Sequence, residues 1–325
     1  MDTNTLINRL QKIVENRKSI DRVLKIFISI GLLIFLVSYI SIEKITTVFL
    51  SAKYEYILYA SILSLVNIYL QAYKWKLVLN YSLGDVTFMR ALHSYFGGVT
   101  SGLSTPARIG EFIGRAIPLE EFNFFSVTIV SFIDKIINMI VITFFGAISS
   151  VFFYRSFNEP HFYVDVPLLI IIVSLFAIIV YMLFNSSFFV SVVKRKFKNN
   201  QKVLNKISVV DKFLSQDLSV KVKIFSINIL FFIVILFQFA LLVNAFASYT
   251  DIIQLMIIAS LILFATTVVL PFSFGDLGVR EGAASYLVGM ISLSPVIGFN
   301  SALVLFIINV IFPAFIGLIF LIKNK

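Results

Sequence analysis

Cysteine is absent from the 325 residues, and only two histidines are present. The lack of cysteine excludes disulfides, thiolate nucleophiles and cysteine-based metal sites. Charged residues are also scarce, at 14% of the chain, whereas a soluble domain carries about a quarter. Since 59% of the residues are hydrophobic, the chain cannot cover its apolar side chains with polar surface in water. We therefore expect lipid to be its solvent.

Long apolar runs dominate the sequence, and the run from Phe231 to Leu242 is typical. A helix needs about 20 apolar residues to cross the hydrocarbon core, whereas a barrel strand is a shorter segment of alternating polarity. The runs therefore predict an all-α, polytopic transmembrane bundle of about eight spans. The net charge of +10 does not indicate nucleic acid, because cytoplasmic loops of such proteins are basic in any case.

The predicted spans fall into two halves that we interpret as pseudo-repeats, residues 23–184 and 224–325. An amphipathic segment, residues 1–22, precedes them, and a basic linker, residues 185–223, separates them. The distribution of Lys and Arg predicts that the N-terminus, the linker and the C-terminus are cytoplasmic. Apolar spans are expected near residues 23–42, 54–73, 124–154, 164–184, 224–247, 252–271, 278–293 and 295–322.

Two polar segments allow more than one interpretation. Residues 1–22 suit a helix on the cytoplasmic membrane surface or a helix that binds a partner. The basic residues of the linker, residues 185–223, either set the orientation of the chain in the membrane and attract anionic lipid, or form a binding site for a glycosyltransferase. At the end of the second span, we interpret Lys74, Trp75 and Lys76 as an interfacial anchor.

One further hydrophobic stretch, residues 91–122, is interrupted and is expected to enter and leave the membrane on the cytoplasmic side, as a re-entrant hairpin or two short helices. Residues 98–104 are so rich in Gly, Ser and Thr that we expect irregular backbone there. Thr105 suits a helix N-cap, and Pro106 suits the first helical position. In a helix that begins at Pro106, three charged residues fall within about 60° of one face. They are Arg108, Glu111 and Arg115.

A matching interruption lies in the second half, in residues 270–293. Pro271 and Gly275 are expected to break one helix, and Asp276 suits the cap of the next. The first turns of that next helix carry Arg280 and Glu281.

Paired broken helices in corresponding positions of two halves indicate a transporter site. An arginine beside the positive end of a short helix favours an anionic group such as phosphate. The alternative is that the arginines and glutamates only pair with each other and lock the helices together.

Asp134 and Lys135 lie within the apolar run of residues 124–154. They are either a pair that reaches the membrane interface, or Asp134 is a partner for Arg108, Arg115 or Arg280. The amides inside the spans are interpreted mostly as interhelical hydrogen bonds. They include Asn67, Gln71, Asn138, Asn228, Gln238 and Asn309.

The two interrupted segments resemble signatures of a known family. The sequence STPARIGEFIGR, Ser104 to Arg115, resembles the Pro-x-Arg-x-Gly-Glu signature of the lysylphosphatidylglycerol synthase transmembrane family. The sequence LPFSFGDLGVREG, Leu270 to Gly282, resembles its later signature, in which a Gly-rich turn leads to Gly-x-Arg-Glu. The resemblance covers nearly the whole chain. It departs from the family at Val130-Ser131, where many relatives carry Glu-Arg, and at Asp276, where a glycine is usual.

The resemblance implies about eight helices with re-entrant elements, and translocation of an anionic or lysylated phospholipid or another lipid-linked headgroup. It implies that Arg108, Glu111, Arg280 and Glu281 line the path. We do not predict lysine transfer, because no run of the chain is long and polar enough for an aminoacyl-transferase domain.

The leading hypothesis is therefore a lipid translocase of the cytoplasmic membrane, with Arg108, Glu111, Arg115, Asp134, Arg280 and Glu281 as substrate-binding residues. We expect no catalytic residue, cofactor or metal, and an oligomer is possible. The first alternative is a membrane transferase that acts on polyprenyl-phosphate lipids, with the loop residues Glu159, His161 and Asp165 as its acidic or basic groups. The second is a non-catalytic membrane partner of a glycosyltransferase.

Overall fold

The computed structural model describes residues 42–103, 105, 108–158, 162–184, 201–269 and 278–323, and all of the regular secondary structure in these ranges is helical. The all-α prediction is confirmed. The helices are α2 (Ile42–Leu50), α3 (Tyr54–Ser82), α4 (Phe88–Leu103), α5 (Gly110–Ala116), α6 (Phe124–Arg155), α7 (Phe162–Phe184), α9 (Gln201–Leu214), α10 (Leu218–Phe246), α11 (Ile252–Val269), α12 (Val279–Met290), α13 (Pro295–Phe306), the π-helix η2 (Ile307–Ile311) and α14 (Phe312–Lys323).

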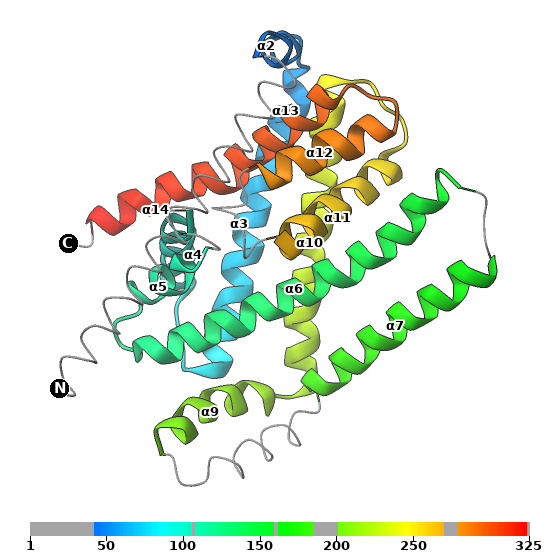
Figure 1. The fold of residues 1–325 in the computed structure, drawn as a ribbon. Helices are drawn as coiled ribbons and strands as arrows, with labels where there is room; N and C mark the ends of the chain where they lie inside the picture. Colours follow the sequence, from blue (N-terminus) through cyan, green and yellow to red (C-terminus); the bar gives the residue numbers. More distant parts are fainter. Residues whose placement is uncertain are drawn as a thin grey trace, which may run out of the picture.

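Within these ranges, six helices are long and apolar enough to cross a membrane. They are α3, α6, α7, α10, α11 and the continuous run of α13, η2 and α14. Figure 1 shows α6 and α7 side by side, with α10 crossing behind α6, and α11 also packs against α6. The span expected near residues 23–42 lies almost wholly outside the described residues, so the total of about eight spans stays a prediction.

Helices α4 and α5 lie between the first two of these spans in sequence and pack closely against each other. The expected irregular backbone at 98–104 is wrong for residues 98–103, because α4 continues to Leu103. Its glycines permit this packing: a Cβ on Gly114 would lie 2.1 Å from the carbonyl oxygen of Gly97, and one on Gly110 would lie 2.2 Å from that of Ser101. Close packing between the two helices offsets the low helix propensity of glycine.

The second helix of this pair begins later than predicted. Helix α5 starts at Gly110 rather than at Pro106, which lies outside the described residues. The N-cap of α5 is Ile109, so the predicted cap at Thr105 is wrong, although Thr105 Oγ1 accepts a hydrogen bond of 2.7 Å from the Gly110 amide. Entry of the α4–α5 pair from one face of the membrane stays a prediction.

In the second half, α11 ends at Val269, and α12 begins after Gly278, whose φ of 81° suits only glycine. Pro271, Gly275 and Asp276 lie outside the described residues. With 12 residues, α12 is about 18 Å long and is too short for the span expected at residues 278–293. It packs on α13, where a Cβ on Gly298 would lie 2.2 Å from the Ala284 carbonyl.

The C-terminal part of the basic linker is helical and lies against the bundle. Helix α9 contacts α3 and α6, as the lower part of Figure 1 shows. Lys212 and Gln216 donate hydrogen bonds to the carbonyls of Leu83 and Tyr81, at the end of α3. Helix α10 begins at Leu218, six residues before the expected start of the second half.

Candidate functional site

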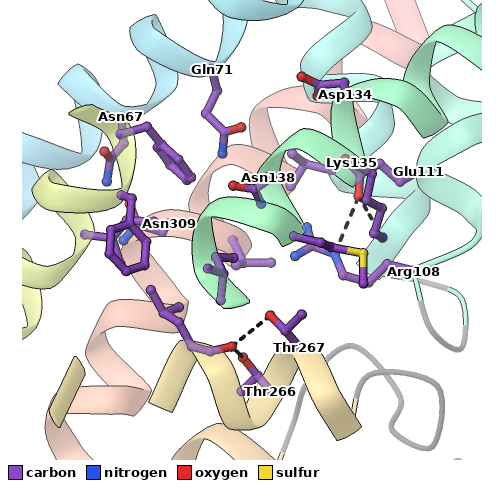
Figure 2. A pocket seen from close by; sticks show the side chains of 18 of the residues that line it. Asn67, Gln71, Arg108, Glu111, Asp134, Lys135, Asn138, Thr266, Thr267 and Asn309 are labelled. Atoms are coloured by element: carbon purple, nitrogen blue, oxygen red, sulfur yellow. Dashed lines mark hydrogen bonds and ion pairs between the residues drawn. The ribbon is translucent and has the colours of Figure 1, made fainter. Parts of the chain in front are cut away.

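A cavity of about 210 Å³ lies inside the bundle, and residues from both halves line it. Helices α3, α4, α5 and α6 contribute from the first half, and α10 to α13 with η2 contribute from the second. Figure 2 shows polar side chains from several of these helices around this space. Its charged lining residues are Lys74, Arg108, Glu111, Arg115, Asp134, Lys135 and Arg280.

A chain of ion pairs runs along one wall of this cavity. Lys74 Nζ lies 2.9 Å from Asp134 Oδ1, and Arg115 Nη1 lies 2.9 Å from Asp134 Oδ2. The other terminal nitrogen of Arg115 lies 2.6 Å from Glu111 Oε1. Lys74 also donates to Asn228 Oδ1 at 3.0 Å. Asp134 therefore holds two cations from different helices, and the chain joins α3, α5, α6 and α10.

At Glu111, the end of this ion-pair chain, the distances to the neighbouring cations are longer. Glu111 Oε2 lies 3.7 Å from Lys135 Nζ and 4.0 Å from Arg108 Nε. Arg108 has a φ of 54°, a left-handed backbone conformation that costs a non-glycine residue about 1–2 kcal/mol. Such strain clusters at functional sites. Although Arg108 precedes α5 rather than lying within it, the structure brings it together with Glu111 and Arg115 as the sequence predicted.

The ion-pair chain lies well inside the bundle. Lys74 is eight residues before the end of α3, about 12 Å along the helix, and Asp134 is ten residues into α6, about 15 Å. Their exposed fractions are only 2% and 3%. Asp134 is therefore a buried partner of Arg115, and the alternative of a pair reaching the interface does not hold for it.

Positive charge exceeds negative charge in this cavity. Of the described residues that line it, five are basic and two are acidic. Ionisable groups in a membrane bundle are costly, and they usually mark a substrate or ion path. This excess of basic over acidic side chains among the described lining residues suits an anionic ligand.

From the second half, Arg280 reaches the same cavity as Arg108. It is 93% buried, and its guanidinium lies over the Phe306 ring at 4.8 Å from the ring centre. Its neighbour Glu281 is placed differently, because its Oε2 accepts a 2.8 Å hydrogen bond from the Gly278 amide and so caps α12. Glu281 is not among the described residues that line the cavity.

Asn67 and Asn309 lie across the cavity from Arg108 and Glu111 (Figure 2). Asn67 and Asn309 both donate to Gln238 Oε1, and Gln238 Nε2 donates to the Ala60 carbonyl at 2.8 Å. These are interhelical hydrogen bonds, as the sequence predicted. Asn309 lies in η2, and π-helical turns of this kind occur frequently at functional sites.

Sequence reasoning missed two residues of this site. Lys74 and Trp75 were expected to anchor the membrane interface, but both are buried. Trp75 Nε1 donates to Ser94 Oγ at 2.9 Å, and its ring lies 4.6 Å from the Arg115 guanidinium carbon. A signal was present: Asn67, Gln71 and Lys74 recur at intervals of four and three residues, which places them on one helix face.

The loop residues of the alternative enzyme hypothesis are only partly described. Asp165 Oδ2 lies 3.1 Å from Arg155 Nε. Glu159 and His161 lie outside the described residues. Within the described ranges, no group of three or more His, Asp or Glu side chains is placed to hold a metal ion.

Comparison with known proteins identifies the family but no individual relative. Neither the curated proteins nor the solved structures contain a match to this chain. The family model described as the lysylphosphatidylglycerol synthase TM region matches residues 22–317, which is most of the chain. The match includes both interrupted segments and every charged residue of the cavity. The chain is an integral membrane protein that belongs to the lysylphosphatidylglycerol synthase transmembrane family.

Proposed function

We propose that this protein is a lipid translocase that moves an anionic or lipid-linked headgroup across the cytoplasmic membrane. The observation that carries the proposal is the cavity between the two halves, whose described lining residues include five basic and two acidic side chains. Substrate-binding roles fall to Arg108, Glu111, Arg115, Asp134 and Arg280. The protein is proposed to act with both termini in the cytoplasm.

A translocase must shelter a charged headgroup while it crosses the hydrocarbon core. A bare charge at the bilayer centre costs from about 2.5 to more than 10 kcal/mol, depending on the method of estimate. Guanidinium groups offset this cost for phosphate, because their planar fork donates two hydrogen bonds to one oxyanion. Arg115 and Arg280 come from opposite halves, so they support a phosphate held between the halves.

The acidic residues have a role when no lipid is bound. Asp134 bridges Lys74 and Arg115, and Glu111 lies close to three cations. Without these carboxylates, the empty cavity would hold uncompensated buried cations, which is strongly unfavourable. The cavity therefore keeps some positive charge for a ligand while the bundle remains stable.

We propose that lipid movement either is driven by a gradient across the membrane or runs down the concentration gradient of the lipid itself. The sequence contains no Gly-x-x-x-x-Gly-Lys-Ser/Thr motif for binding a nucleotide.

The test is lipid movement in proteoliposomes that contain the purified protein. We expect wild-type protein to expose an anionic lipid to a reagent that cannot cross the membrane. Arg280→Ala should slow this movement at least tenfold. Arg90→Ala is the matched control, because Arg90 is exposed and pairs with Glu121 outside the cavity. Equal rates of lipid movement for wild type and Arg280→Ala would show that Arg280 does not bind the lipid on its path.

The same preparation separates the alternatives. Formation of a product from a polyprenyl-phosphate lipid, without lipid movement, would favour the transferase hypothesis. Co-purification of a glycosyltransferase that is lost when the basic linker is neutralised would favour the partner hypothesis.

A further inference from the structure

The two carboxylate oxygens of Glu111 are held differently. Oε1 lies 2.6 Å from Arg115 Nη2, which is the distance of a short charge-assisted hydrogen bond. Oε2 lies 3.7 Å from Lys135 Nζ and 4.0 Å from Arg108 Nε, and both distances exceed the range of a hydrogen bond. The two longer contacts can be followed in Figure 2. Glu111 therefore has one oxygen bonded to Arg115 and one that faces two cations at longer range.

The position of Oε2 is a point on which two cations converge. Arg108 precedes α5, and Lys135 belongs to α6, so the two side chains approach from different elements. Any anionic oxygen at this point lies within 4.0 Å of both. A phosphate oxygen accepts the same charge-assisted hydrogen bonds as a carboxylate oxygen. The point therefore suits a ligand phosphate as well as it suits Glu111.

Glu111 is the carboxylate that a ligand in the cavity meets. Its side chain lines the cavity and is 15% exposed. The side chain of Asp134 is only 4% exposed, and both of its oxygens lie 2.9 Å from a cation. A phosphate group in the cavity therefore competes with Glu111 rather than with Asp134.

Arg115 stays in place when Glu111 gives up a partner. Its Nη1 lies 2.9 Å from Asp134 Oδ2, and its guanidinium lies over the Trp75 ring. Its carbonyl oxygen accepts a 2.6 Å hydrogen bond from Ser94 Oγ. Since Arg115 keeps a carboxylate in every case, a change at Glu111 does not leave a buried cation without an anion.

We infer that Glu111 is an internal competitor for the anionic ligand: the ligand phosphate displaces Oε2 from Arg108 and Lys135, and the returning carboxylate favours release. This inference rests on the proposed function and adds a control of affinity at the same site. A protein that conducts its ligand must bind it strongly enough for entry and weakly enough for exit. Glu111 supplies the second condition.

The test is binding of two phosphate probes to the purified full-length protein in neutral detergent, with Kd measured by isothermal titration calorimetry. One probe is dihexanoyl phosphatidic acid, a short-chain lipid, and the other is inorganic phosphate. Glu111→Gln keeps the size of the side chain and removes its charge. We expect this variant to bind phosphatidic acid about tenfold more tightly than wild type.

Two further variants separate competition at this position from the overall charge of the protein. Glu111→Asp keeps the negative charge but withdraws the carboxylate from Arg108 and Lys135 by one methylene group. It should bind phosphatidic acid about threefold more tightly than wild type. Glu121→Gln is the matched control, because Glu121 pairs with Arg90 and is not among the described residues that line the cavity. Its Kd should equal that of wild type.

Binding by Glu111→Gln that equals wild type or is weaker would overturn the inference, because Glu111 would then only hold the cations in place. Equal tightening in Glu111→Gln and Glu121→Gln would also overturn it, since overall charge would account for the effect. Glu111→Asp that binds no more tightly than wild type would do the same, and this variant decides alone if Glu111→Gln does not fold.

Failure of the inference and failure of the proposed function give different results. Lipid movement that depends on Arg280, without tighter binding in the Glu111 variants, would refute the competition and leave the translocase standing. Tighter binding of inorganic phosphate in the Glu111 variants, with no binding of phosphatidic acid, would refute the lipid translocase. It would leave the competition standing, with free phosphate as the ligand.

Discussion

Individual residues of the cavity show how a membrane protein tolerates buried charge. Lys74, Arg115 and Asp134 are each at least 95% buried, and each has an oppositely charged partner within 3 Å. The attraction within such a group compensates for desolvation only while every member is present. The chain of ion pairs, the proposed ligand site, is therefore also a condition of stability.

Lys74→Met removes one cation of the chain and tests this dependence. Breaking a buried ion pair by removing one partner costs about 3–5 kcal/mol, because Asp134 would lose one of its two cations. We expect a clear fall in the thermal midpoint of the protein in detergent. Lys76→Met, two residues away and only partly buried, should change the midpoint little. The same midpoint for both variants would contradict a structural role for Lys74.

At the scale of elements, small residues decide where helices meet. Helix α4 packs against α5 through Gly97 and Gly114, and against α14 through Gly317, where a Cβ would lie 2.2 Å from Thr100 Oγ1. These contacts bring Arg115 to the cavity wall. The glycines of α4 and α5 thus serve close approach between helices rather than flexible backbone.

Gly114→Ala is the direct test of that contact. Its Cβ would lie 2.1 Å from the Gly97 carbonyl oxygen, so α4 and α5 would have to move apart. Overpacking of this kind costs about 1–3 kcal/mol. We expect a lower thermal midpoint together with slower lipid movement.

Gly84→Ala serves as the control, because its Cβ would meet only Phe122 at an ordinary 3.5 Å. A Gly114→Ala protein that is as stable as Gly84→Ala would show that the two helices do not pack as described.

For the whole molecule, the orientation in the membrane is the prediction on which the direction of transport depends. The loop between α9 and α10 follows a basic segment, whereas the loop between α10 and α11 carries no basic residue. The positive-inside rule places the first in the cytoplasm and the second outside.

The absence of cysteine makes this prediction easy to test, since each introduced thiol is unique. We expect Thr250→Cys to react in intact cells with a maleimide that cannot cross the membrane. Ser215→Cys should react only after the cells are permeabilised. Both positions are exposed, so the reverse pattern would invert the proposed orientation.

Several features could be read from the sequence because lipid acts on each segment separately. A span must be apolar over about 20 residues whatever it later contacts, so the runs of α6, α7, α10 and α11 were evident. The charged residues Arg108, Arg115 and Asp134 also stood out, because charge inside such runs is rare and costly.

Only the tertiary structure decided which buried groups meet. Lys74 lies beside an interfacial tryptophan pattern in the sequence, and its burial depends on Asp134 and Asn228 from two other helices. Residues 98–103 have poor helix propensity, yet they are helical because α5 packs against their glycines. Local hydropathy determined that these segments belong in the membrane, whereas long-range contacts determined their partners, because helices in lipid associate through packing and polar contacts that hydropathy does not record.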